Sequence, residues 1–308
     1  DYVKERKQME YTAKEVTAEE LEQWPRESYH LVDVRSEEDF QTGKMPDALR
    51  VDLDRITEGN HSIPKDKRVN IVAIQLEAFS DFTLLGLEGI EDIYAPYHEL
   101  ERESYAGDLV TNIFGGGTID TERCFLTGYT QLKDYRQNTN SYVWYLREQG
   151  YTANGSHPCL RGFYNRYNVN RYLGFEDYLF TEQYYEKYSY PFALDNNLFP
   201  EILAHFKSDV ASGKDVFSFN VTYQGHGPYY SEGLAYDEPF WNGDVSDYSY
   251  YVVNNYLGSV KDTIERLCEL KDELEAMQEP VVLLVYGDHM PWLGDNNTAY
   301  TELGVNLD

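Results

Sequence analysis

The stretch NIVAIQLEAF, residues 70–79, decides the fold class of this chain. Its first seven residues are almost wholly apolar, which is typical of a strand that is buried on both faces of a parallel sheet. Similar runs occur at VFSFNVT, residues 216–222, and at VVLLVYG, residues 281–287. Because these runs alternate with helical patterns, we predict an α/β fold with a mainly parallel central sheet flanked by helices.

Helical patterns lie between the predicted strands. Apolar residues from Val253 to Leu274 recur at spacings of three, four and seven, which predicts a long helix packed on the core. Two further helices are predicted at 141–150 and 197–213, since each segment ends on a glycine, the residue favoured just past a helix C-terminus. We interpret all three helices as structural elements.

Composition limits what the chain can bind. Of the 308 residues, 42% are hydrophobic, as in globular proteins, and no apolar run approaches the ~18 residues of a membrane span. Lys and Arg total 26 against 54 Asp and Glu, which gives a net charge of −28. A field of that sign repels polyanions, so we predict no nucleic-acid partner. A bound anion would need a local pocket that contains cationic groups or a metal.

The segment before about residue 65 differs from the remainder because it is highly charged. The stretch YHLVDVRSEEDFQTGKMPDALRVDL, residues 29–53, resembles the first half of a rhodanese-like domain, with an LVDVR strand and a helix after it. A catalytic rhodanese needs a cysteine after the next strand, and NIVAIQLEAF offers none, so sulfur transfer is disfavoured. We therefore predict two regions: residues 1–64, a degenerate rhodanese-like half or an unrelated strand and helix, and residues 65–308, the main domain.

Polar residues directly follow two of the predicted strands. Glu77 ends the first strand, and Asp288 and His289 leave the last one. Functional groups of α/β sheets gather at the carboxyl ends of strands, and a buried carboxylate is costly unless it is paired or bound to a cation. Each residue alone is more simply interpreted as a capping acid or a core histidine. Together they predict a cation site.

The stretch FGGGTIDTE, residues 114–122, places three glycines before a threonine. If Thr118 begins a helix after this turn, its hydroxyl lies in a position suited to anions, and a nearby divalent metal would lower the pKa of that hydroxyl. Thr118 would then be a nucleophile toward phosphorus. The alternative is that Thr118 or Asp120 is an ordinary N-cap.

Five motifs, in this order, resemble the extracellular catalytic domain of lipoteichoic acid synthases and related phosphoglycerol transferases, in the alkaline phosphatase and sulfatase superfamily. They are IVAIQLEAF, FGGGTIDTE, SHPCLRGFYNRYNVNRYLGFEDYLF (156–180), TYQGHGPY (222–229) and VYGDHMP (285–291). The resemblance implies an alkaline phosphatase-like fold over roughly residues 69–295. Because domains of this family continue past the Asp-His motif, we expect the fold to extend beyond Asp308.

The resemblance also implies a metal site. Its ligands would be Glu77, Thr118, Asp288 and His289. The metal would be one divalent ion, manganese by preference with magnesium or zinc as alternatives, since mostly oxygen ligands with one imidazole suit such ions. Thr118 would also be the catalytic nucleophile.

Four further positions match residues that bind the substrate in this family. Arg166, within FYNR, matches a ligand of the substrate phosphate, a role suited to the planar donors of a guanidinium. Tyr164 stands where lipoteichoic acid synthases have tryptophan, which puts its stacking or hydrogen-bonding role in doubt. His157 and His226 match histidines that line the substrate site and would help Arg166 to neutralise the phosphate oxygens.

The implied reaction is metal-dependent transfer of phosphoglycerol from a phosphatidylglycerol-like lipid, through a covalent phospho-threonine, to a glycerophosphate polymer in lipoteichoic acid or related cell-envelope synthesis. The alternatives are phosphoethanolamine transfer, phosphodiester hydrolysis and non-catalytic sensing of glycerophosphate. Sulfatase activity is disfavoured because neither Cys124 nor Cys159 lies in the C/S-x-P-x-R context that matures to formylglycine. The resemblance further implies an extracellular domain at a bacterial cell membrane, anchored by transmembrane segments outside this sequence.

Overall fold

The computed structural model describes residues 32–33, 49–50, 68–111, 113–130, 135–188 and 193–307. The chain divides into two compact units, Asp1–Ile63 and Pro64–Asp308. In the first unit, the described residues form two short parallel strands, β1 (Val32–Asp33) and β2 (Leu49–Arg50). The rest of the predicted rhodanese-like half lies outside the described residues, so that interpretation stays a prediction.

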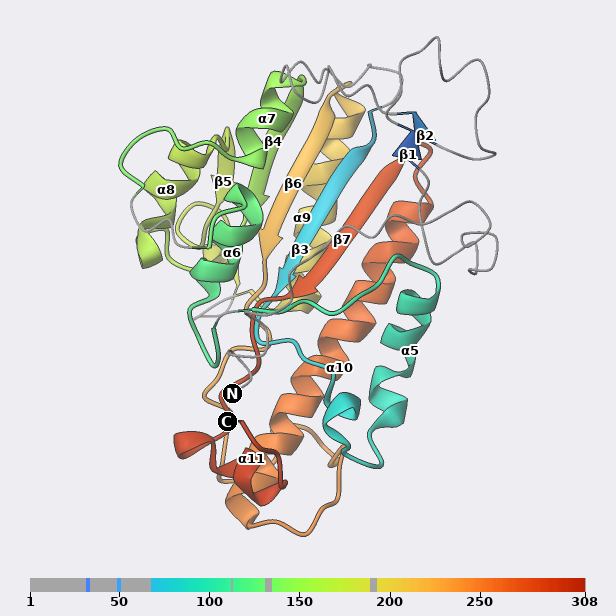
Figure 1. Ribbon diagram of the computed structural model, residues 1–308, viewed down its shortest axis with the longest axis vertical. Coiled ribbons are helices and arrows are strands. Elements are labelled where there is room, and N and C mark those ends of the chain that lie inside the picture. The colour runs from blue at the N-terminus through green and yellow to red at the C-terminus, as the bar shows by residue number, and fades with distance from the viewer. Residues whose placement is uncertain are drawn as a thin grey trace. The chain divides into compact units, whose positions relative to one another are not determined.

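A five-stranded parallel sheet forms the centre of the second unit (Figure 1). The strand order is β5-β4-β6-β3-β7. The strands are β3 (Asn70–Leu76), β4 (Tyr151–Ser156), β5 (Asp177–Leu179), β6 (Asp215–Val221) and β7 (Val281–Gly287). The predicted α/β class with a parallel central sheet is confirmed, and its three apolar runs become the three adjacent strands β6, β3 and β7.

The register of β3 and β7 positions the residues that follow them. Leu76, the last residue of β3, pairs with Gly287, the last residue of β7. The backbone N–H of Asp288 then donates to the carbonyl of Leu76 at 3.1 Å. As a result, Glu77 and Asp288 leave the sheet side by side at its C-terminal edge.

Helices cover both faces of the sheet (Figure 1). On one face, alternate β3 side chains such as Val72 and Ile74 pack in one hydrophobic cluster with α9 (Asp195–Ala211) and α10 (Asp247–Glu275). Helix α10 also contacts α5 (Glu91–Arg102). The alternation of side chains along a strand places Ala73 and its neighbours on the opposite face.

The opposite face carries the helices that lead to the functional site. Phe125 of α6 (Thr118–Thr127) stacks on Phe219 of β6, with 5.5 Å between the ring centroids. Helix α7 (Tyr142–Glu148) contacts β4. In the part of the chain that the structure describes, the other α-helices are α8 (Arg166–Leu173) and α11 (Thr298–Glu302), and α11 packs against α10.

The predicted helix ends agree with the glycines chosen to mark them. Gly150 and Gly213, which follow α7 and α9, have φ values of 94° and 81°, in the left-handed region that favours glycine. The long apolar pattern from Val253 to Leu274 lies within α10, as predicted. Among the described residues, no helix combines the length and the apolar character that crossing a bilayer requires.

Candidate active site

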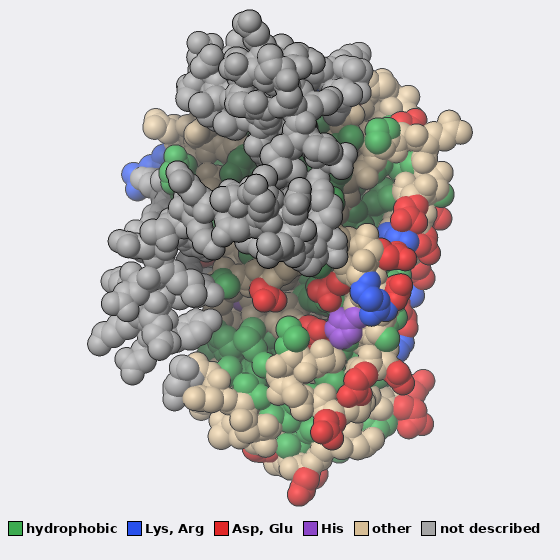
Figure 2. Space-filling model, turned by 45° about the vertical axis from the view of Figure 1, so that its right-hand side comes forward, with side chains coloured by type: hydrophobic (Ala, Val, Ile, Leu, Met, Phe, Trp, Pro, Cys, Tyr) green, Lys and Arg blue, Asp and Glu red, His purple; other side chains and the backbone are tan. Residues whose placement is uncertain are grey.

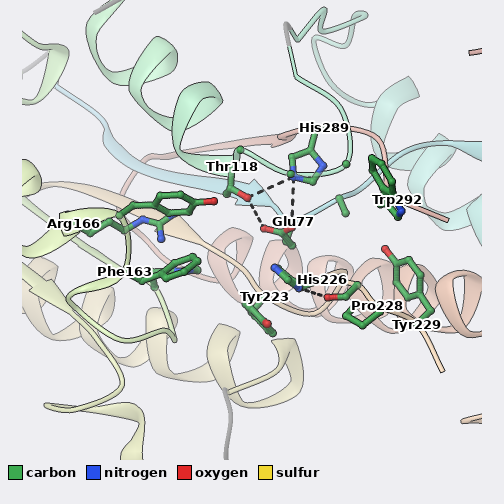
Figure 3. A pocket seen from close by; sticks show the side chains of 17 residues that line it. Glu77, Thr118, Phe163, Arg166, Tyr223, His226, Pro228, Tyr229, His289 and Trp292 are labelled. Carbon is green, nitrogen blue, oxygen red and sulfur yellow. Dashed lines mark hydrogen bonds and ion pairs between the residues drawn. The ribbon is translucent and has the colours of Figure 1, made fainter. Parts of the chain in front are cut away.

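Three separate chain segments meet at the C-terminal edge of the sheet (Figure 3). Thr118, the first residue of α6, donates a hydrogen bond from Oγ1 to Oε2 of Glu77 at 3.0 Å. Nε2 of His289 lies 3.5 Å from the same hydroxyl and 3.6 Å from Oε1 of Glu77. The structure therefore brings Thr118, Glu77 and His289 together, as the sequence predicts.

Asp288 is the fourth member of this group and is fully buried. Its Oδ1 accepts a hydrogen bond from the backbone N–H of Ala78 at 2.8 Å, and its Oδ2 lies 3.4 Å from Nε2 of His289. Oδ2 is buried and has no hydrogen-bond partner. Because an unsatisfied buried carboxylate oxygen is costly, this atom is suited to a cation.

The donor set fits a divalent metal. Glu77, Asp288 and His289 each offer one ligand atom, and these atoms all lie within 4.8 Å of one another. Two carboxylates and one imidazole, with the Thr118 hydroxyl beside them, are ligands that suit manganese, magnesium or zinc. The group is a candidate metal centre, in which these four side chains are the available ligands.

Without a bound cation, the negative charges of Glu77 and Asp288 would repel each other. Burial raises the pKa of Glu77 to about 8, and the neighbouring charge of Asp288 adds to this rise. Burial also raises the pKa of Asp288, although the charge of His289 acts in the opposite direction. A divalent cation would allow both groups to ionise at neutral pH.

The glycine run sets the position of Thr118. Gly115, Gly116 and Gly117 have φ values of 65°, 148° and 85°, which side chains of L-residues rarely adopt. Gly117 occupies the N-cap position, and Thr118 is already helical. The alternative that Thr118 or Asp120 is an ordinary N-cap is therefore wrong, because the backbone turn supplies the cap and the threonine hydroxyl turns toward Glu77.

Contacts from β3 and from the segment after β7 hold this turn. Nε2 of Gln75 donates to the carbonyl of Thr118 at 3.1 Å, and Gly115 donates its backbone N–H to the carbonyl of Met290 at 3.0 Å. A Cβ atom at Gly115 would lie 2.6 Å from Cε3 of Trp292, so the close approach of Trp292 also requires glycine there.

A cavity of about 270 Å³ opens over the group (Figure 3). The four residues predicted to bind the substrate, His157, Tyr164, Arg166 and His226, all line it, together with Glu77, Thr118 and His289. Further walls come from residues that the sequence does not single out. They are Phe163, Tyr223, Pro228, Tyr229 and Trp292.

Arg166 carries the fixed positive charge of the cavity. Its side chain is only 1% exposed, and its Cζ lies 5.4 Å from the centroid of the Tyr164 ring, a cation–π distance. Tyr164 and Asn165 have φ values of 53° and 56°, so a left-handed turn immediately precedes Arg166. Tyr164 thus contacts the cation with its ring face, although it replaces the tryptophan of the family pattern.

The two histidines predicted to line a substrate site differ in their surroundings. Nδ1 of His157 lies 3.1 Å from the carbonyl of Val221 and must donate to it, because a carbonyl only accepts. Burial, and then the charge of Arg166, hold the pKa of His157 well below its usual value. The lowered pKa favours the neutral form of His157 at neutral pH. His226 stacks on Tyr223, with 4.5 Å between ring centroids.

Glu122 is a buried acid of the site that the sequence does not reveal by itself. It is 0% exposed and forms an ion pair with Arg166. The available signal is its spacing from Thr118, because residues four apart lie on the same face of a helix.

The guanidinium of Arg166 lies in a protein that is strongly acidic overall. The net charge is −28, and acidic side chains are prominent along one side of the face in Figure 2. Within the cavity, the guanidinium of Arg166 is the group that attracts an anion, because the nearest charges dominate at short range.

Comparison with known proteins identifies relatives of the chain. Two are from Rhizobium meliloti (strain 1021). A candidate cyclic beta-1,2-glucan modification protein is 29% identical over 215 residues, which are 66% of this chain and 33% of that protein. The capsular polysaccharide biosynthesis protein RkpI is 25% identical over 237 residues, 72% of this chain and 41% of that protein. The chain thus spans well under half the length of these relatives.

Solved structures share the fold at low sequence identity. The phosphoglycerol transferase GacH of Streptococcus pyogenes, in complex with sn-glycerol-1-phosphate, has a TM-score of 0.61 at 17% identity, over 81% of this chain and 69% of that chain. The lipoteichoic acid synthase LtaP of Listeria monocytogenes has a TM-score of 0.56 at 17% identity, over 72% of this chain and 56% of that chain.

The family follows from a match over most of the chain. Residues 69–305 match the model of the family described as Sulfatase. This range contains the whole central sheet and every residue of the candidate active site. The chain therefore belongs to the sulfatase family.

Proposed function

We propose that this domain transfers phosphoglycerol from a phosphatidylglycerol-like lipid to a hydroxyl of a cell-envelope glycopolymer, through a phosphoryl group held covalently on Thr118. The observation that carries the proposal is the Thr118 hydroxyl, which donates to Glu77 beside the candidate metal centre and shares its cavity with the buried Arg166. GacH is a phosphoglycerol transferase and LtaP a lipoteichoic acid synthase, which supports phosphoglycerol as the transferred group. The two Rhizobium relatives, named for glucan modification and capsular polysaccharide biosynthesis, support a glycopolymer acceptor.

Two displacements at phosphorus make up the proposed reaction. In the first, Oγ1 of Thr118 attacks the phosphodiester of the lipid, the bond from phosphorus to the diacylglycerol oxygen breaks, and the threonine proton passes by way of Glu77 to that leaving oxygen. In the second, an acceptor hydroxyl attacks the phospho-threonine, and its proton returns to Oγ1 as the bond to Thr118 breaks. Water as the acceptor would make the same site a phosphodiesterase.

The side chains have separate tasks in this scheme. Glu77, Thr118, Asp288 and His289 would hold a divalent metal, manganese by preference, which when bound lowers the pKa of the threonine hydroxyl and offsets the carboxylate charges. Arg166 binds the phosphate oxygens through its guanidinium donors. His157, being neutral with Nδ1 as donor, offers Nε2 as an acceptor for a hydroxyl of the substrate.

Threonine as nucleophile separates this proposal from sulfate ester hydrolysis. Neither Cys124 nor Cys159 lines the cavity, whereas Thr118 does. The proposed partners are a phosphatidylglycerol-like lipid and a glycerophosphate-bearing or other glycan acceptor, and the proposed location is the outer face of a bacterial cell membrane, where both occur.

Turnover of a fluorescent phosphatidylglycerol tests the proposal. With Mn²⁺ present, the wild-type protein should release fluorescent diacylglycerol and, in mass spectra of the digested protein, carry phosphoglycerol on Thr118. Thr118→Ala should abolish both signals, whereas Thr127→Ala, on the same helix but outside the cavity lining, should retain them. Undiminished turnover by Thr118→Ala would overturn the covalent mechanism, and preference for phosphatidylethanolamine would reassign the head group.

A further inference from the structure

We propose that Glu122 is a positioning residue that fixes which edge of the Arg166 guanidinium faces the substrate phosphate. The inference rests on the proposed function, because it takes Arg166 as the phosphate ligand. Glu122 does not line the cavity and acts only through Arg166.

Glu122 contacts a single edge of the Arg166 guanidinium, through one carboxylate oxygen. Nε of Arg166 donates to Oε2 of Glu122 at 2.9 Å, and Nη2 lies 2.9 Å from the same oxygen. These two nitrogens form one edge of the planar guanidinium, so Glu122 occupies that edge. Both side chains are almost completely buried, at 0% and 1% exposure, so solvent does not screen the pair.

Among the described residues, the other edge of the guanidinium, formed by Nη1 and Nη2, makes no hydrogen bond, although both atoms are buried. The single contact of Nη2 is the ion pair with Glu122, which leaves its second N–H and both N–H groups of Nη1 without an acceptor. Oε1 of Glu122 also lacks a partner. An ion pair that served stability alone would be expected to join both carboxylate oxygens to the guanidinium in a bidentate manner.

Unsatisfied charged donors indicate a missing acceptor. Burying N–H donors of a guanidinium without partners is costly, and Arg166 is among the residues that line the cavity (Figure 3). Phosphate oxygens are the acceptors that fit a pair of parallel guanidinium donors. The Nη1–Nη2 edge is therefore the one that binds phosphate, and Glu122 is what turns it toward the cavity.

Helix α6 holds the proposed nucleophile and Glu122 at a fixed distance from each other. Thr118 and Glu122 are four residues apart on the same helix, so the attacking oxygen and the anchor of Arg166 belong to one rigid element. Arg166 itself begins α8, which the ion pair ties to α6. The distance between nucleophile and phosphate ligand is thereby fixed before substrate binds, which favours a reactive geometry.

Kinetics of Glu122→Gln test the proposal in the Mn²⁺-loaded protein. Glutamine keeps the shape but removes the charge that orients Arg166, which itself remains to attract the phosphate. We expect kcat on fluorescent phosphatidylglycerol to fall roughly 10–100-fold, the usual effect of losing a supporting residue, with KM changed far less. Glu122→Asp, which keeps the charge but withdraws the oxygens, should show the same pattern and serves if the glutamine variant does not fold.

A double-variant cycle separates positioning from a purely structural role. If Glu122 acts through Arg166, Glu122→Gln should cause no further loss of kcat in the Arg166→Ala background. Added guanidinium chloride should restore part of the activity of Arg166→Ala, since the Glu122 carboxylate can hold the free cation, and should not restore the double variant. Fully additive losses, equal rescue of both variants, or wild-type kcat in Glu122→Gln would each overturn the proposal.

The same cycle can be measured without turnover. Calorimetry with sn-glycerol-1-phosphate gives the binding affinity of each variant, and the effect of Glu122→Gln on affinity should likewise vanish when Arg166 is alanine. An inactive wild type would refute the proposed function while this binding cycle still decides the role of Glu122.

Discussion

Ala78 donates its backbone N–H to Oδ1 of Asp288 at 2.8 Å, joining the chain just after β3 to the chain just after β7. Ala78 has a φ of 50°, a left-handed conformation that costs roughly 1 kcal/mol in a residue with a side chain. Strain of this kind is concentrated at functional sites. Asp288 thus uses one carboxylate oxygen to fix the backbone beside Glu77 and leaves the other available to the proposed cation.

Asp288→Asn should separate these two tasks. The amide oxygen can still accept from Ala78, so the fold should persist, but the lost charge should remove most of the metal affinity. In wild type, Mn²⁺ at 100 times its Kd should raise the free energy of unfolding by about 2.7 kcal/mol, and in the variant by far less. Thermal denaturation with and without Mn²⁺ measures this, and equal gains would exclude Asp288 as a ligand.

Metal affinity should rise with pH and level off near pH 8. Burial raises the pKa of Glu77 to about 8 in the metal-free protein, so below that pH the ion must displace a proton. One displaced proton makes affinity change up to about tenfold per pH unit. Calorimetry at pH 6.5 in buffers of different ionisation enthalpy counts the released protons. Glu77→Gln is the control, and a pH-independent affinity in wild type would contradict the expectation.

Asp195, at the start of α9, should make the protein less stable as pH rises from about 4 to 7. Burial raises its pKa to about 7 from 3.8, and Oδ2 accepts only from Thr263, at 2.7 Å. In this window the native state keeps a proton that the unfolded state has lost, so stability falls by up to about 1.4 kcal/mol per pH unit. Urea denaturation at several pH values should show this slope in wild type and a smaller one in Asp195→Asn.

Gly225→Ala should damage the active site through the backbone of Glu77. A Cβ at position 225 would lie 2.1 Å from the carbonyl oxygen of Glu77. That oxygen cannot move without displacing the Glu77 side chain, the proposed metal ligand. We expect a loss of about 1–3 kcal/mol in the free energy of unfolding, together with weaker Mn²⁺ binding. Gly107→Ala, where no atom lies within 4 Å, is the matched control. Unchanged Mn²⁺ affinity in Gly225→Ala would show that the site tolerates the displacement.

The central strands could be predicted because burial on both faces leaves a direct mark in the sequence. β3, β6 and β7 consist of apolar runs, and the prediction for each is correct to within one residue. β4, with the sequence YTANGS, carries no such run. Its Gly155 lies so close to β6 that a Cβ there would meet the carbonyl of Phe219 at 2.1 Å. Close backbone packing of this kind selects small residues, which resemble a loop when only the sequence is read.

The residues of the candidate site could be predicted where they directly follow an apolar strand. Glu77, Asp288 and His289 adjoin apolar strands, and neighbouring parallel strands must bring their carboxyl ends together. Glu122 has no such mark, since an acid near the start of a helix is ordinarily an exposed residue that favours the helix dipole. Its partner Arg166 lies 44 positions away, and only the folded structure brings the two side chains together.

The adjacency of β3 and β7 also has a consequence for biosynthesis. Ala78 and Asp288, which this adjacency joins, are 210 positions apart in the chain. A nascent polypeptide that has left the ribosome only as far as residue 280 already contains Thr118, Glu77 and Arg166, yet lacks two of the side chains that would grip the ion. If Thr118 is the nucleophile, as proposed, the candidate site is therefore incomplete on the ribosome until β7 and the residues that follow it have been made.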